Sequence, residues 1–180
     1  MNLKKNIFDK EHAEFMNQFI SEYKEKGYNV EHEVPYNWYG DRGFIDIVLC
    51  KGNKLIICEL KPQLTDIGET IRQVRKAEDV FLKAKPEYSR FEDIKFVLVL
   101  KATNENLEVC KQYSEVLKGV KVIFWNTDKK AQERISLEYE NLLHGRLEAE
   151  NNVRTICLIC KKPVYSDLAL CDDCAKIRWG

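Results

Sequence analysis

The spacing of apolar residues predicts a helix followed by a strand at the start of the chain. Between residues 9 and 26, apolar side chains recur at helical intervals, and Gly27 is placed to end the helix. Residues 28–34 alternate between apolar and polar and stop at Pro35, which predicts a first strand. A loop rich in tyrosine, tryptophan and glycine is expected to follow, through Gly43.

Two apolar, β-branched runs then predict a hairpin. They cover residues 44–50 and 54–60, and Gly52-Asn53 between them is a favoured turn sequence. If the turn is centred on these two residues, Asp46 lies directly opposite Glu59.

Beyond the hairpin, the pattern predicts alternating helices and strands. Asp66 with Glu69 three residues later resembles a capping box at the start of a helix. Strands separated by helices form crossovers, which make parallel strands. The expected helices cover residues 67–85 and 105–117, and the expected strands cover residues 96–100 and 120–125. Residues 128–150 fit both a strand and a helix, and both alternatives stay open.

These elements predict an α/β fold, with a central mixed sheet flanked by helices and a small module at the C-terminus. We expect a core over residues 1–127, a connecting segment over 128–152 and a four-cysteine module over 153–180. The chain of 180 residues has room for one ordinary domain and one short module.

Composition excludes several classes of protein. Hydrophobic residues make up 44% and charged residues 32%, and no apolar run is long enough to span a bilayer, so a membrane protein is not expected. The N-terminus lacks the apolar stretch of a secretory signal, which together with the cysteine pattern indicates a reducing, cytoplasmic setting. The net charge of zero means that any contact with DNA must be local.

The hairpin carries the candidate chemistry. In the predicted register, the carboxylates of Asp46 and Glu59 lie close enough to bind one small hard cation. Lys61, two residues beyond Glu59, falls on the same face and adds a positive charge that stabilises a phosphoryl transition state. The alternative is that all three are solvent-side residues of an amphipathic hairpin. The apolar residues around both carboxylates favour the site, because burying an acid without a ligand is costly.

This arrangement resembles the PD-(D/E)XK phosphodiesterase superfamily, which includes Holliday-junction resolvases, restriction enzymes and RecB-like nucleases. The resemblance covers about residues 9–101 and implies a restriction-endonuclease-like core. Its motifs are Gly43-Phe44-Ile45-Asp46-Ile47-Val48, Glu59-Leu60-Lys61 and Arg72-Gln73.

The resemblance implies roles for individual residues. Asp46 and Glu59 would bind Mg²⁺ or Mn²⁺, Lys61 would serve the attacking water, and Gln73 on the next helix would support the site. A purely structural role for Gln73 stays open. The family's Pro-Asp pair is Ile45-Asp46 here, which keeps the ligand.

The first helix also supplies a residue near the metal in such relatives. His12, Glu11 and Glu14 are the candidates, with His12 on the inward stripe, where it can equally be a packed core residue. RecB-like members often carry a tyrosine where this chain has Ala77, so an endonuclease is favoured over an exonuclease.

Aromatic and basic residues near the hairpin are candidates for DNA contact. Tyr36, Trp38 and Tyr39 have the chemistry to stack on an unpaired base or wedge a duplex, and packing under the loop is the alternative. The basic residues Arg72, Lys76 and Lys83 form a row at helical spacing that suits a phosphate backbone or a solvated face.

Four of the seven cysteines predict a zinc site. Cys157, Cys160, Cys171 and Cys174 form two CxxC pairs ten residues apart, the spacing of a zinc ribbon or paired knuckles, and an iron-sulfur cluster is the weaker alternative. Cys50, Cys58 and Cys110 are expected to be metal-free buried thiols. DNA contact, protein docking, homodimerisation and a purely structural cap stay open as roles of the module.

The sequence hypothesis is therefore a metal-dependent DNA endonuclease with catalytic Mg²⁺ or Mn²⁺ and structural Zn²⁺. The rival hypothesis is a catalytically inactive protein of the same fold that binds nucleic acid or regulates through its zinc module.

Overall fold

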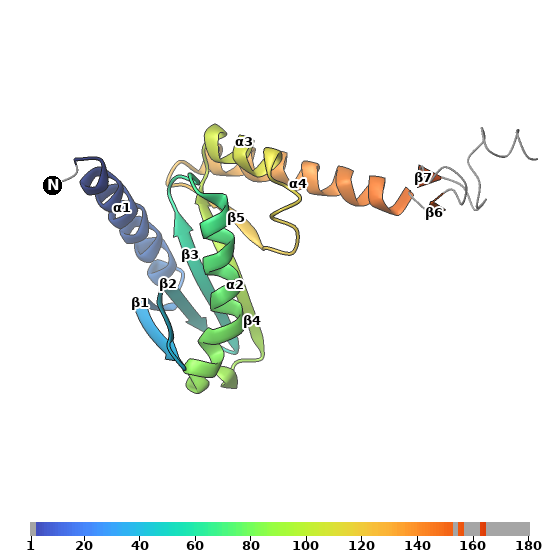
Figure 1. The fold of residues 1–180 in the computed structure, drawn as a ribbon. Helices are drawn as coiled ribbons and strands as arrows, with labels where there is room; N and C mark the ends of the chain where they lie inside the picture. The colour runs from blue at the N-terminus through green and yellow to red at the C-terminus, as the bar shows by residue number, and fades with distance from the viewer. Residues whose placement is uncertain (1–2, 153–154, 157–162, 165–180) are drawn as a thin grey trace, which may run out of the picture. The chain divides into compact units, whose positions relative to one another are not determined.

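The computed structural model describes residues 3–152, 155–156 and 163–164, and side chains between residues 10 and 145. The chain divides into two units, Met1–Ser136 and Leu137–Gly180. Figure 1 shows the order of the elements. The elements of the first unit are α1 (Leu3–Glu25), β1 (Asn29–Trp38), β2 (Asp41–Lys51), β3 (Lys54–Lys61), α2 (Ile67–Ala84), the 3-10 helix η1 (Pro86–Arg90), β4 (Asp93–Lys101), α3 (Asn104–Gln112) and β5 (Val122–Trp125).

The first unit is built on a five-stranded mixed sheet in the order β1-β2-β3-β4-β5. The first three strands are antiparallel and the last three are parallel. The two-residue turn Gly52-Asn53 joins β2 to β3, and the predicted register is confirmed from Lys51 with Lys54 to Ile47 with Cys58. The ladder ends there, so the predicted pairing of Asp46 with Glu59 does not form. The expected α/β class with a mixed sheet is also confirmed.

A helix covers each face of the sheet. Phe15 and Phe19 from α1 pack against Trp125 at the end of β5, with ring centroids 5.4 Å apart in both pairs. On the opposite face, Phe81 of α2 is fully buried and stacks on Tyr88. Burying these aromatic rings is a large part of the driving force for folding.

The predicted capping box of α2 forms in part. Asp66 Oδ1 accepts a hydrogen bond from the Glu69 amide at 2.9 Å, as an N-cap should. The Glu69 carboxylate does not return to the cap, because it forms a two-point ion pair with Arg72.

Two elements end at residues clearly different from those predicted. Pro35 does not end the first strand: β1 continues through it to Trp38, and β2 begins at Asp41, so the expected aromatic loop is the end of a long hairpin. Proline is tolerated because β1 is an edge strand and loses no partner on its outer side. The helix expected over residues 105–117 is also shorter than predicted, because α3 ends at Gln112.

The connecting segment is helical. Helix α4 (Lys129–Asn152) runs across the division between the two units, and no strand forms at Ile135–Tyr139. In the second unit, β6 (Thr155–Ile156) pairs with β7 (Pro163–Val164). The zinc ligands predicted at Cys157, Cys160, Cys171 and Cys174 lie outside the described residues. Within the described part of the chain, no helix has the length and apolar character needed to cross a membrane.

Candidate functional site

The site begins at a kink in the β1–β2 hairpin. Glu33 and Asp46 stand opposite each other but are left out of the ladder, which resumes on both sides of them. Glu33 has a φ of +50°, a left-handed conformation that costs energy for a residue with a side chain. Ile47 packs in the cluster under α1, whereas Ile45 packs in the cluster under α2. A regular strand would place both on one face, so the hairpin turns over at Asp46.

The Asp46 carboxylate occupies the point where β2 and β3 separate. Their ladder ends at Ile47 and Cys58, and the Leu60 amide then donates to Asp46 Oδ2 at 2.7 Å. His12 reaches the same point from α1. Its Nε2 donates to the Leu60 carbonyl at 3.1 Å and lies 3.5 Å from Asp46 Oδ2. The adjacent Asp46 carboxylate raises the pKa of His12 above its ordinary value.

Glu59 and Lys61 form the second half of the site. Lys61 Nζ lies 2.7 Å from Glu59 Oε1, and only 15% of the Glu59 side chain is exposed. Burial, together with the negative charge of Asp46, raises the pKa of Glu59, although the Lys61 ammonium opposes this shift. A positive charge in addition to Lys61, placed between the Asp46 and Glu59 carboxylates, would reduce their mutual repulsion.

Helix α2 borders Glu59. Val74 and Ala77 line a small cavity with Glu59, and Gln73 lies one residue before Val74. The Gln73 Oε1 atom is buried and has no hydrogen-bond partner in the part of the chain that the structure describes. A buried acceptor without a partner is unusual and suits a position where water or a cation binds.

Tyr36 connects the site to the outer part of the hairpin. It is paired with Gly43 across the strands, and a Cβ on Gly43 would lie 2.6 Å from the Tyr36 hydroxyl oxygen. Glycine is therefore required for the ring to lie across β2. Burial, followed by the charges of Glu59 and Asp41, raises the pKa of Tyr36. The phenol thus lies within the electrostatic reach of the candidate metal ligand.

Asn106 holds the segment that follows Lys61. The Asn106 side chain is buried on α3 and accepts a hydrogen bond from the Leu64 amide at 2.8 Å. Its amide group donates to the carbonyls of Pro62 and Lys101, each at 2.9 Å. Sequence reasoning missed this residue. Asn106 lies in the first turn of α3, after the N-cap residue Thr103, where polar residues are common. Its position in the sequence therefore does not indicate that it is buried.

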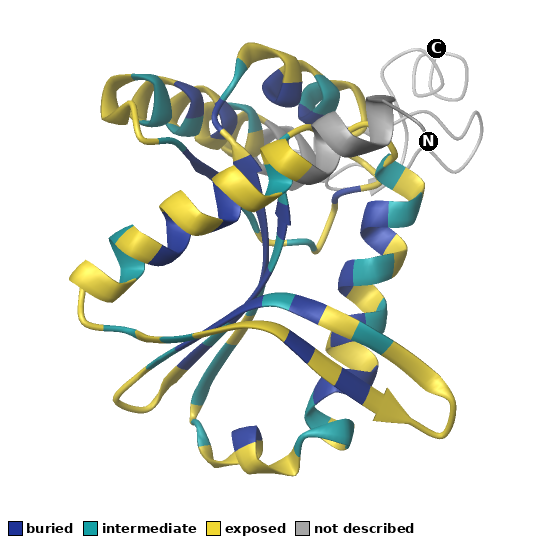
Figure 2. Cartoon of the chain, turned by 90° about the vertical axis from the view of Figure 1, so that its left-hand side faces the viewer, coloured by how far each residue is buried: buried dark blue, intermediate teal, exposed yellow. Residues whose placement is uncertain are grey.

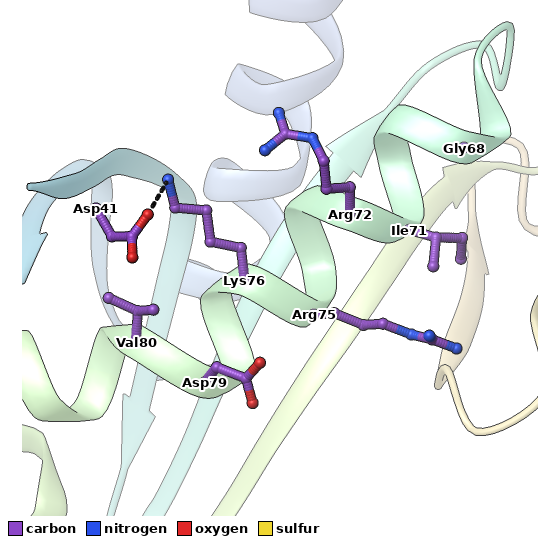
Figure 3. Close-up of a pocket in the computed structure, with 8 residues that line it drawn as sticks. All are labelled: Asp41, Gly68, Ile71, Arg72, Arg75, Lys76, Asp79 and Val80. Atoms are coloured by element: carbon purple, nitrogen blue, oxygen red, sulfur yellow. Dashed lines mark ion pairs between the residues drawn. The ribbon is translucent and has the colours of Figure 1, made fainter.

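A hollow of about 510 Å³ lies along α2 (Figure 3). Arg72, Arg75 and Lys76 line it together with Asp41 and Asp79, so basic residues outnumber acidic ones by three to two. Lys76 is paired with Asp41 at 3.3 Å, which ties α2 to the end of the hairpin. Lys83, the third member of the predicted basic row, does not line this hollow.

Several predicted residues thus have definite places. Of the first-helix candidates, His12 lies beside Asp46, whereas Glu11 and Glu14 are exposed. The structure brings Glu59 and Lys61 together, and Asp46 acts on Glu59 through its charge. Cys50, Cys58 and Cys110 are free thiols; Cys58 and Cys110 are buried and Cys50 is half-buried.

The donor set suits a hard divalent cation but is not a ready-made cage. No group of three His, Cys, Asp or Glu residues is arranged to hold a metal ion within the described residues. Two mostly buried carboxylates and the free Gln73 Oε1 are oxygen donors of the kind that Mg²⁺ and Mn²⁺ use, often with water completing the shell. The residues present therefore fit such an ion.

Comparisons with protein-family models, curated proteins and solved structures give no match to this chain.

Proposed function

We propose that the first unit is a metal-dependent DNA nuclease with a PD-(D/E)XK-like, restriction-endonuclease-like core. The observation that carries the proposal is the placement of the Asp46 and Glu59 carboxylates where β2 and β3 separate. Burying a carboxylate without a ligand is energetically unfavourable. Asp46 is held there by the Leu60 amide and His12, and Glu59 is neutralised by Lys61 at 2.7 Å. Buried, electrostatically coupled acids of this kind are typical of functional sites.

Asp46 and Glu59 would hold Mg²⁺ or Mn²⁺, with Gln73 Oε1 as a further oxygen donor. When bound, such an ion supplies a nucleophilic water and neutralises charge on a phosphoryl oxygen. Lys61 provides a fixed positive charge beside Glu59, which stabilises the extra negative charge of the transition state. His12 keeps Asp46 oriented.

The reaction is hydrolysis of a phosphodiester. A bond forms between phosphorus and the water oxygen as the bond from phosphorus to one ester oxygen breaks. The water gives up a proton, and the leaving oxygen takes one up, so neither an oxidant nor a second substrate is needed.

Because the net charge of the chain is zero, any attraction to DNA must be local, and basic residues on α2 provide it. Arg72, Arg75 and Lys76 line one hollow beside the helix that borders Glu59 (Figure 3). Side chains of this kind bind phosphate oxygens and fix the register of a nucleic acid without reading its sequence. We place the DNA backbone along this hollow.

The C-terminal cysteines extend the proposal. Cys157, Cys160, Cys171 and Cys174 would bind one Zn²⁺ and form a module that guides substrate or a partner. This part of the proposal rests on the spacing of the cysteines in the sequence.

One observation favours the rival function, binding without cleavage. Glu59 is already neutralised by Lys61, and the described residues form no three-ligand metal group. Lys61 thus already supplies one positive charge beside Glu59, so the two functions must be separated by experiment.

Cleavage assays separate them. The full chain is incubated with linear, nicked, branched and single-stranded DNA in Mg²⁺, in Mn²⁺ or in EDTA. We expect product only with a divalent ion, and no product from Asp46→Asn or Glu59→Gln. The control is Asp93→Asn, which removes a carboxylate at the far end of β4 and should cut normally. Binding of these DNAs without cleavage in either metal would support the rival function.

A further inference from the structure

The end of the β1–β2 hairpin presents aromatic rings to solvent. Tyr39 is 94% exposed and Trp38 is 38% exposed, and their rings meet edge to face at 4.9 Å. Figure 2 shows this end of the hairpin as exposed. Tyr36, the third aromatic residue considered from the sequence, is buried and belongs to the core. The packing alternative thus applies to Tyr36, and the two outer rings need another explanation.

The turn holds the Tyr39 ring outward at an energetic cost. Tyr39 has a φ of +48° and is followed by Gly40 at +92°. The left-handed region is unfavourable for a side chain as large as tyrosine, and glycine or asparagine would form the same turn more readily. An exposed aromatic ring in a strained turn is poorly explained by stability, which points to a binding role.

The aromatic end adjoins the basic hollow. Lys76 Nζ donates to the Arg42 carbonyl at 3.2 Å and pairs with Asp41, the residue across the strands from Trp38. In the regular ladder beyond the kink, Trp38 lies two residues from Tyr36 and therefore on the same face. That face leads back to Glu59, whose charge acts on Tyr36.

We propose that Trp38 and Tyr39 stack on an unpaired base of DNA whose backbone lies in the α2 hollow. The inference rests on the proposed nuclease function and names its substrate: DNA in which unpaired bases adjoin a duplex. The combination argues for nucleic acid over a protein partner. Rings accept the faces of any base, and Arg72, Arg75 and Lys76, which line the hollow together with Asp41 of the hairpin, match phosphates.

The test measures binding without cleavage. The full chain is titrated in EDTA with a duplex that carries a single-stranded arm, labelled with 2-aminopurine at the first unpaired position, and with the fully paired duplex. We expect tighter binding to the armed duplex and a change in 2-aminopurine fluorescence. Tyr39→Gly removes the ring and suits the left-handed turn, so the hairpin should stay folded. We expect it to bind the armed duplex about 5- to 100-fold more weakly.

The control is Tyr113→Ala, because Tyr113 is 38% exposed, the same as Trp38, and lies at the end of α3. It should bind like the wild type. Equal affinity of the wild type for both duplexes, or unchanged binding and fluorescence in Tyr39→Gly, would overturn the inference. Failure of this inference and failure of the nuclease proposal give different results. If the protein prefers unpaired bases but never cuts DNA, the stacking surface is supported and the nuclease proposal fails. If it cuts DNA without this preference, the nuclease proposal is supported and the stacking surface fails.

Discussion

Replacing Asn106 with leucine should destabilise the first unit strongly. Leucine has a similar volume but leaves the Leu64 amide and the Pro62 carbonyl without their partner, whereas the Lys101 carbonyl keeps its bond from the Thr103 amide at 2.9 Å. Each buried group left unsatisfied costs about 1–3 kcal/mol, and some relaxation toward water is expected at the loop. We therefore expect the free energy of unfolding to fall by about 2–5 kcal/mol.

Urea denaturation followed by circular dichroism measures this change. The matched control is Asn104→Leu two residues earlier, because Asn104 is exposed and bonds only the Arg134 side chain among the described residues. It should cost less than about 1 kcal/mol. If Asn106→Leu lost no more stability than Asn104→Leu, Asn106 would not be what holds the segment after Lys61.

Three further predictions concern charges and metals. In EDTA at neutral pH, Glu59→Gln should unfold at a higher urea concentration than the wild type. The raised pKa of Glu59 means that its charged form is disfavoured in the fold, and glutamine removes that charge. An unchanged or lower urea midpoint would contradict this. Because the pKa of His12 is raised in the fold, its protonation stabilises the fold below about pH 6.5, and this contribution is lost as pH rises through the folded-state pKa. In EDTA, the free energy of unfolding of His12→Gln should therefore depend less on pH in this range than that of the wild type. Elemental analysis should find about one zinc per chain and none in Cys171→Ser, whereas a Cys50→Ser control should keep its zinc.

The hairpin register was predictable because a two-residue turn fixes the pairing of its strands. Once Gly52-Asn53 is recognised, every pair from Lys51 with Lys54 to Ile47 with Cys58 follows. The same rule failed one step further. Asp46 and Glu59 are not a ladder pair, because the Leu60 amide bonds to the Asp46 carboxylate instead of continuing the ladder.

The kink that causes this departure has no local signature. Glutamate rarely adopts the left-handed conformation, so the sequence around Glu33 does not indicate that this residue has a positive φ. The reversal of faces between Ile47 and Ile45 comes from packing against two different helices. Tertiary contacts of this kind override local pattern, so the sequence could indicate candidate residues but not their arrangement.

The most direct test of the account is whether Asp46 and Glu59 bind a divalent cation together. Titration of Mn²⁺ into the full chain, followed by electron paramagnetic resonance of the free ion, counts the bound ions. We predict about one Mn²⁺ that is lost in Asp46→Asn and in Glu59→Gln and kept in Asp93→Asn. Binding of the same number of ions by all four proteins would contradict the metal site, and with it the proposed nuclease.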